Sequence, residues 1–271
     1  RHVYGLDQPL AVRYLHWLAD TIRGRMGYSF YFHAPVLTII WPRLLRTLLL
    51  AGVALFIAWA VALTLGTLAA RRRGGWADRL SGALVLVTSS LPLIVLALAA
   101  LALAARTNLF TVGATTQDFA AAFNPLRVFV PALVFATPLV ALFLAQTREG
   151  LGAALAEEFV QVARAKGLSE RAVILRHALR AALNPLITIF GYSLGSVVGG
   201  SIIVETILGW PGLGQLSVTA VVSRDVPLLM GIVLVTATAV LVGNLLADIL
   251  LRLNDPRLRQ ADSQTTKAHA A

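Results

Sequence analysis

Long uncharged stretches alternate along the chain with short segments that are rich in arginine. The five uncharged stretches cover residues 47–70, 80–105, 128–147, 181–204 and 226–247. Each is close to the roughly 20 residues that a helix needs to cross about 30 Å of hydrocarbon. A helix also leaves no backbone group unpaired in lipid. The pattern therefore predicts an all-α membrane protein with five transmembrane helices, the last of which continues to about residue 251.

Proline and apolar periodicity add detail to this outline. Pro92, Pro131 and Pro138 lie inside predicted spans and are expected to kink them, because proline donates no backbone N–H. Residues 1–43 mix polar and apolar positions and contain one apolar helical face, which predicts an amphipathic helix lying at the membrane interface. That face consists of Tyr14, Leu15, Trp17, Leu18 and Ile22. Residues 44–254 then form the transmembrane domain.

A polar block over residues 157–185 separates the third and fourth spans. It predicts two short helices whose acidic residues stand near the N-termini and whose basic residues stand near the C-termini, as the helix dipole favours. Gly167 is placed to end the first helix, and Ser169 is placed to cap the second. Asn184-Pro185 is expected to break or kink the chain. A rigid helix–glycine–helix block between two spans is typical of a docking surface for a soluble partner.

Composition and charge exclude several classes of protein. Charged residues make up 13% of the chain, about half the share in a soluble domain, and the mean hydropathy is +0.77. The net charge of +10 is explained by arginine-rich loops against anionic lipid, not by nucleic acid. There is no cysteine, which excludes disulfides and thiolate metal sites.

The distribution of basic residues predicts the orientation. Fourteen lie in the segments after the first, third and fifth spans, and only Arg106, Arg127 and Arg224 lie in the short loops between spans on the opposite side. The positive-inside rule places the fourteen in the cytoplasm. The loop 148–180 and the tail 255–271 are then cytoplasmic, and residues 1–43 are extracytoplasmic. That N-terminal segment is itself basic, which an additional helix upstream of it would explain.

No catalytic motif is present in the sequence. Neither Lys166 nor Lys267 belongs to a phosphate-binding loop of the G-x-x-x-x-G-K-[ST] type. The histidines are scattered without metal-ligand spacing, and no nucleophile elbow accompanies a plausible triad. We therefore expect no enzymatic activity, no cofactor and no metal site.

Three motif clusters give the chain a specific resemblance. The cytoplasmic block contains A-R-A-K-G-L-S at 163–169 and L-N-P at 183–185, a later loop contains G-W-P-G-L-G at 209–214 with Asp225 downstream, and the tail contains D-P-R at 255–257. Together they resemble the permease subunits of ABC importers, most closely the dipeptide, oligopeptide and nickel branch. Gln161 stands where that superfamily has a glutamate. G-L-D-Q-P-L at 5–10 and M-G-Y-S at 26–29 resemble the extracytoplasmic segment that follows the branch's first membrane helix, so the resemblance implies a further helix upstream of this segment.

The resemblance implies a fold, partners and site residues. It implies a type I permease bundle in the bacterial inner membrane, working with a second related permease, two ATP-binding subunits and an external substrate-binding protein. The first helix of the block would couple this chain to an ATP-binding subunit through residues on and beside that helix: Glu158, Gln161, Ala163, Arg164, Gly167 and Arg171. The extracytoplasmic loop would be marked by Pro211, Gly212, Gly214 and Asp225.

Small residues recur in the fourth predicted span. Gly191, Gly195 and Gly199 share one helical face, which lets a second helix approach closely. That neighbour is either a helix of the same chain or the second permease. Asp248, near the cytoplasmic end of the last span, is expected to form a structural pair, although acids at this depth are also functional candidates.

Two other functions remain open from the residues alone. A secondary transporter or channel that acts without partners would need intramembrane acids or broken helices near the bilayer midplane, and the five uncharged stretches contain no such acid. A membrane anchor for other proteins would need no ATP-binding subunit. The substrate also remains open among peptides, nickel and other solutes, as do the residues that line the path and the identity of the second permease.

Overall fold

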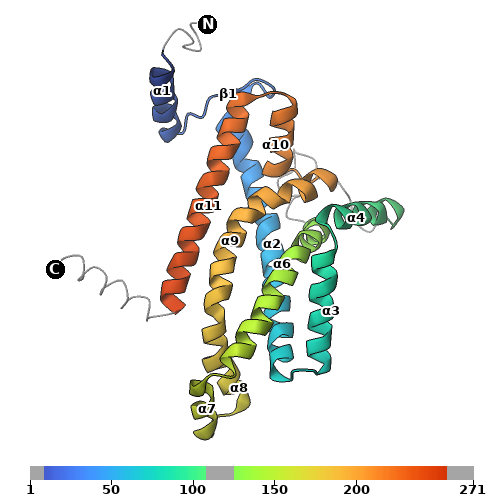
Figure 1. Cartoon of the computed structure of the whole chain (residues 1–271). Helices are drawn as coiled ribbons and strands as arrows, with labels where there is room; N and C mark the ends of the chain where they lie inside the picture. The colour runs from blue at the N-terminus through green and yellow to red at the C-terminus, as the bar shows by residue number, and fades with distance from the viewer. Residues whose placement is uncertain (1–8, 108–124, 255–271) are drawn as a thin grey trace, which may run out of the picture.

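The computed structural model describes residues 9–107 and 125–254, apart from the side chains of residues 10, 13, 125–126 and 194–200. The predicted cytoplasmic tail 255–271 lies outside this range. Almost all of the described chain is helical (Figure 1). The first half contains these elements: α1 (Leu10–Ile22), β1 (Tyr28–Ser29), β2 (Ala34–Pro35), α2 (Val36–Arg71), α3 (Trp76–Ser90) and α4 (Leu93–Thr107).

The second half continues the helical bundle. It contains α6 (Pro125–Ala154), α7 (Glu158–Ala165), α8 (Glu170–Ala172), the π-helical turn η2 (Val173–Ala178), α9 (Leu179–Ile207), α10 (Leu213–Val222) and α11 (Val226–Asn254). β1 and β2 form a small antiparallel hairpin with Tyr28 opposite Pro35. The hairpin and α10 lie at one end of the bundle, whereas α7 and α8 project from the other end (Figure 1).

Four helical segments of the described chain are long and apolar enough to cross a membrane. They are Val36–Arg71, Arg127–Ala154, Glu170–Ser193 and Val226–Asn254. The fifth candidate is the pair α3 and α4, whose axes are bent by 92° at their junction. The predicted single helix over 80–105 is therefore wrong. Pro92 follows Leu91, which has an extended backbone with φ −90° and ψ 118°, as steric clash with a following proline favours. A kink was expected there, and the chain instead turns through a right angle.

The first span is longer than its uncharged stretch. α2 begins at Val36, directly after the hairpin, so residues 36–43 belong to the helix and not to the extracytoplasmic segment. Val36, Ile40 and Leu44 are buried against α10 and α11 in a cluster that includes Leu216. This packing stabilises the additional turns, although Arg43 and Arg46 interrupt the apolar pattern. Pro131 and Pro138 lie inside α6 without ending it.

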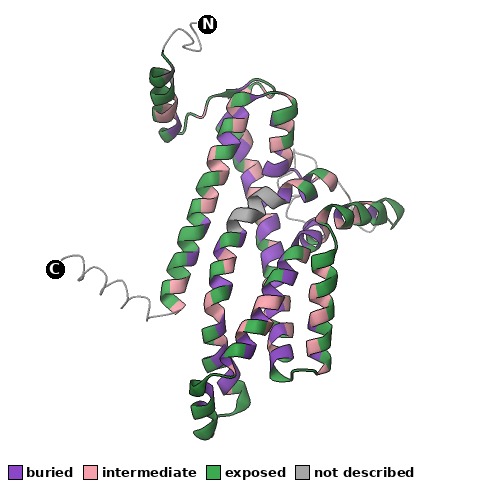
Figure 2. Ribbon diagram, in the orientation of Figure 1, coloured by how far each residue is buried: buried purple, intermediate pink, exposed green. Residues whose placement is uncertain are grey.

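The main core lies between α2 and α6, which pack along much of their lengths. α2 contributes a row of alanines, including Ala54, Ala58 and Ala62, and α6 contributes Phe143 and Leu144. Small residues on one helix against large ones on the other let the two backbones approach closely. Buried residues follow the facing sides of these helices, whereas much of α11 and α4 is exposed on the isolated chain (Figure 2). This distribution is expected for helices that face lipid or another subunit.

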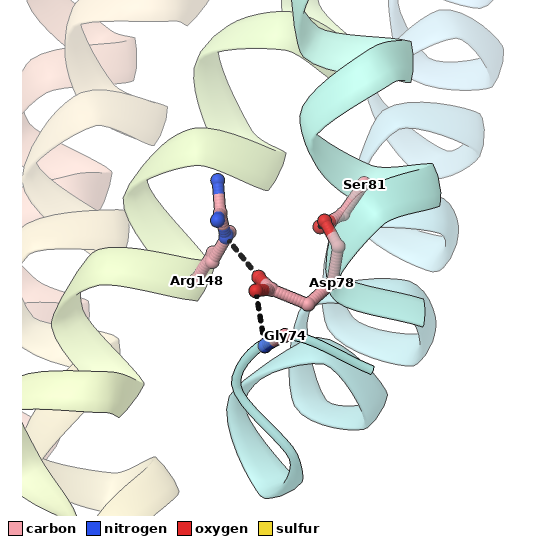
Figure 3. A network of polar contacts seen from close by, with 4 residues as sticks. All are labelled: Gly74, Asp78, Ser81 and Arg148. Carbon is pink, nitrogen blue, oxygen red and sulfur yellow. Dashed lines mark hydrogen bonds and ion pairs between the residues drawn. The ribbon is translucent and has the colours of Figure 1, made fainter. Parts of the chain in front are cut away.

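A polar contact fixes the turn between α2 and α3. One oxygen of the Asp78 carboxylate accepts a hydrogen bond from Arg148 Nε at 2.6 Å, and the other accepts one from the Gly74 backbone N–H at 2.8 Å (Figure 3). Arg148 lies on α6, so this ion pair ties the arginine-rich turn over residues 71–74 to a neighbouring span. The turn is thereby held at the end of the bundle that also carries α7.

Candidate functional site

α7 is a short helix with well-defined ends. It begins after Glu157, whose backbone is extended, and ends at Ala165, with Lys166 in the C-cap position. Gly167 has φ +77°, and its N–H donates to Arg164 O at 2.9 Å while Leu168 N donates to Ala163 O at 3.4 Å. This pair of hydrogen bonds is a Schellman motif, which satisfies two carbonyls at the helix end. The prediction that Gly167 ends the first helix is confirmed.

The two faces of α7 have different surroundings. Val160 and Ala163 are buried in a small cluster with Leu151 of α6, Val173 and Ile174 of η2, Ala70 of α2 and Ala182 of α9. Ala163 is only 5% exposed, so its side chain packs against the bundle within this chain, and its role in coupling stays a prediction. The opposite face carries Phe159 and Val162, which are both exposed. The other predicted coupling residues are exposed too: Glu158, Gln161, Arg164, Gly167 and Arg171.

An ion pair joins α7 to the next helix. Arg164 Nε lies 2.8 Å from Glu170 Oε1, with both side chains partly exposed. Ser169 occupies the N-cap position of α8, but its side chain makes no capping hydrogen bond. The turn between the two helices is therefore held by the glycine and the ion pair.

The sequence predicts a break or a kink at Asn184-Pro185, but the structure shows no break there. α8 continues through η2 into α9, and Pro185 lies inside α9. Buried Ala178, Ala182 and Leu186 keep this segment against the bundle. Asn254 Nδ2 donates to Asn184 Oδ1 at 2.6 Å and to Arg180 O at 3.1 Å. The end of α11 thus holds the beginning of α9 in place, and tertiary contacts outweigh the local effect of the proline.

The G-W-P-G-L-G segment forms a second functional candidate. It was expected to be an extracytoplasmic loop, but Trp210, Pro211, Gly212, Leu213 and Gly214 are all buried. The Trp210 indole Nε1 donates to Arg46 O on α2 at 3.2 Å. The segment therefore turns back into the bundle between α9 and α10 instead of projecting from it.

Glu205 is the polar centre around which this segment folds. Its carboxylate is fully buried and accepts hydrogen bonds from Thr47 Oγ1 at 2.7 Å and from Gln215 N at 3.0 Å. The hydroxyl of Thr47 also accepts a hydrogen bond from Leu213 N at 2.8 Å. Sequence reasoning missed Glu205, because the uncharged stretch ends at Val204. The feature that could have identified Glu205 is its position, directly after an uncharged stretch and a few residues before a glycine-rich turn.

The glycines of the segment allow this close approach. A Cβ atom at Gly212 would lie 2.4 Å from the Glu205 carboxylate, and one at Gly214 would lie 2.6 Å from Ile202 Cα. The second contact is with backbone, which cannot move aside as a flexible side chain can. The glycines in this motif are thus explained by packing around Glu205.

Replacing Gly214 with alanine is expected to destabilise the chain by about 1–3 kcal/mol, the usual range for overpacking. Gly52 gives a matched control, because a Cβ atom there meets nothing within 4 Å, and Gly→Ala in an open helical position stabilises by about 0.5–1 kcal/mol. Thermal unfolding of the two purified variants in detergent checks this. Equal melting temperatures for G214A and G52A would contradict the packing explanation.

Asp225 belongs to a separate network near the hairpin. The buried carboxylate accepts hydrogen bonds from Ser29 Oγ and from Tyr31 N at 3.0 Å through one oxygen, and from Leu228 N at 3.2 Å through the other. It thereby joins the hairpin to the beginning of α11. Of the four predicted loop residues, Pro211, Gly212 and Gly214 lie together and Asp225 lies apart from them.

The glycine row of the fourth span contacts α11 in its described part. A Cβ atom at Gly191 would lie 2.4 Å from Ala247 Cβ, so the neighbour at this position is a helix of the same chain. Gly195 and Gly199 lie in the part of α9 whose surroundings the structure does not describe.

Asp248 is exposed and makes no ion pair within the described residues, whereas the sequence predicted a structural pair. No group of three potential metal ligands occurs among those residues.

Comparison with known proteins identifies the family. Residues 62–260 match the family described as "Binding-protein-dependent transport system inner membrane component". The dipeptide transport system permease protein DppB of Escherichia coli K12 is 34% identical over 94% of this chain and 83% of its own length. The oligopeptide transport system permease protein AppB of Bacillus subtilis 168 is 36% identical over 94% and 82%. The glutathione transport system permease protein GsiC of Salmonella typhimurium LT2 is 32% identical over 96% and 83%.

These matches cover the apolar spans, α7 and the Glu205 segment together, so they describe the whole membrane domain. They agree with a multi-pass helical bundle of the permease type. The chain belongs to the family of inner membrane components of binding-protein-dependent transport systems, as the transmembrane permease subunit of an ABC importer of the peptide branch.

Proposed function

We propose that this chain forms half of the translocation path of an ATP-driven peptide importer. A second related permease supplies the other half, two cytoplasmic subunits hydrolyse ATP, and an external binding protein delivers the substrate. Peptides are favoured as substrates because the relatives are permeases named for dipeptides, oligopeptides and glutathione. The α7 end of the bundle is cytoplasmic in this assignment, and the hairpin end is extracytoplasmic.

The observation that supports coupling is the two-sided structure of α7. Its buried face packs where α2, α6 and α9 meet, through Ala70, Leu151 and Ala182. Its outer face presents Phe159 and Val162 to solvent. An ATP-binding subunit that held the outer face would therefore move three spans at once when it closed on ATP. The Schellman turn at Gly167 and the Arg164–Glu170 ion pair stiffen the helix, so that it transmits displacement without unwinding.

Two features favour a second candidate, a transporter that acts without partners. Glu205 is a buried carboxylate at the edge of a span, and α3 and α4 form a broken helix pair; such transporters use both features. The Glu205 oxygens are, however, occupied by donors from Thr47 and Gln215. This arrangement supports a structural role for the acid and not an ion-binding one.

Reconstitution separates the two functions. We expect proteoliposomes that contain both permeases and the ATP-binding subunits to accumulate a labelled dipeptide only with ATP and with the binding protein. Vesicles that contain this chain alone should show uptake no greater than empty vesicles. Uptake by the chain alone, driven by an ion gradient and independent of nucleotide, would overturn the importer assignment. A version of the complex with an inactive ATP-binding subunit is the matched control.

A further inference from the structure

A cavity of about 790 Å³ lies between the α2–α3 turn and the α7–α8 block. This volume is within the range of pockets that hold small organic ligands. Its apolar wall includes Leu68, Ala70, Leu155 and Ile174, and its polar part includes Arg71, Arg72, Arg164 and Glu170, with Trp76 beside them. The cavity is therefore amphipathic, with an apolar wall and a basic rim.

The charges around the cavity are not balanced within the described chain. Arg164 and Glu170 pair with each other at 2.8 Å. The nearby Asp78 carboxylate is occupied by Arg148 and by the Gly74 N–H. No acceptor among the described residues pairs with the guanidinium groups of Arg71 or Arg72. Two positive charges thus line the cavity without an acid to neutralise them, which favours an anionic ligand.

The position of the cavity indicates the type of anion. Arg71 is the last residue of the α2 span, so in the proposed orientation the rim lies at the cytoplasmic surface of the bilayer. Trp76 is 71% exposed, and tryptophan is enriched at the level of lipid headgroups. Basic pockets between spans on the cytoplasmic side bind the headgroups of acidic lipids. The apolar wall would be left uncovered by free phosphate, whereas a lipid covers both parts.

We propose that this cavity binds the headgroup of an acidic phospholipid. The phosphodiester lies between Arg71 and Arg72, and the glycerol and the first acyl carbons lie along Leu68 and Trp76. Because Leu155 and Ile174 also border the core beneath α7, a bound lipid braces the coupling helix against the α2–α3 turn. This consequence for transport rests on the proposed function, whereas lipid binding itself does not.

The test is a lipid titration of the purified full chain, without partners or nucleotide, followed by native mass spectrometry. The ligands are phosphatidylglycerol, phosphatidylcholine, inorganic phosphate and ATP. We expect selective retention of phosphatidylglycerol. Each arginine near an anionic headgroup is worth roughly fivefold in affinity, so R71Q/R72Q should bind phosphatidylglycerol about 30-fold more weakly, and either single variant about fivefold more weakly.

R79Q/R176Q is the matched control, because it removes two exposed arginines that do not line the cavity. It should keep phosphatidylglycerol affinity within about twofold of the unmodified chain. Melting temperatures of both pairs check that the fold is intact, and the single variants serve if R71Q/R72Q unfolds. The proposal is overturned if both lipids bind equally, if both pairs lose equal affinity, or if inorganic phosphate or ATP displaces the lipid at similar concentrations. It is also overturned if R71Q/R72Q keeps the phosphatidylglycerol affinity of the unmodified chain, because the two arginines would then not hold the headgroup.

Discussion

Replacing Glu205 with alanine is expected to destabilise the chain by about 2–6 kcal/mol, because two buried donors lose their acceptor. The carboxylate accepts from the Thr47 hydroxyl and the Gln215 N–H in a site with no solvent exposure. Each buried donor left without an acceptor costs about 1–3 kcal/mol. The change also empties the space around which Gly212 and Gly214 are packed. The melting temperature of the purified chain should fall by on the order of 10 °C.

Two conservative changes show whether hydrogen bonding is the cause. Glu205→Gln keeps one carbonyl oxygen and the size of the side chain, so its melting temperature should lie between those of the unmodified chain and E205A. Thr47→Ser keeps the hydroxyl that bridges Glu205 and Leu213, whereas Thr47→Val removes it. T47S should therefore be close to the unmodified chain and T47V should melt clearly lower. If E205A and the unmodified chain melt together, Glu205 is not the centre of this segment.

How accurately the sequence predicts the helices and their ends depends on where charged residues lie along them. Four of the five uncharged stretches coincide with long apolar helices, and the fifth is divided between α3 and α4. They misplaced the ends of two spans, since Arg46 on α2 and Glu205 on α9 are buried in protein and not in lipid. An uncharged stretch cannot distinguish these situations. The sequence predicted a kink at Pro92 but not a break between two helices. A proline indicates that a helix is disturbed, whereas the packing of its neighbours determines the angle between the two helix axes.

The candidate site shows the same limit on a smaller scale. Gly167 ends α7 as predicted, since a left-handed backbone is a local property. The orientation of α7 is not local: Val160 and Ala163 form one apolar stripe, Phe159 and Val162 form another, and both have helical spacing. Only the contacts with α2, α6 and α9 show that the first stripe is buried. The remaining stripe is apolar and exposed, which is typical of a surface that a partner covers.

Replacing Val162 with aspartate is expected to abolish ATP-dependent uptake. It should also weaken binding of the ATP-binding subunits by roughly 30-fold or more, which is the usual effect of substituting a residue at the centre of an interface. Val162 is 53% exposed on the outer face of α7, so a carboxylate there is solvated in the free chain and leaves the fold intact. In the complex it would be buried in an apolar contact without a partner, which is costly. Co-purification with the ATP-binding subunits and peptide uptake in proteoliposomes measure the two effects.

V162D isolates docking better than a proline at Ala163 does. A163P would remove a helical N–H at a cost of about 3 kcal/mol and would also disturb the buried cluster beneath α7, so lost transport would have two explanations. Val222→Asp is the matched control: it makes the same substitution at an exposed valine near the end of α10, at the opposite end of the bundle from α7 (Figure 1). V222D should still co-purify with the ATP-binding subunits. The reverse result, with V162D bound and V222D released, would place the ATP-binding subunits at the hairpin end and invert the proposed orientation of the chain.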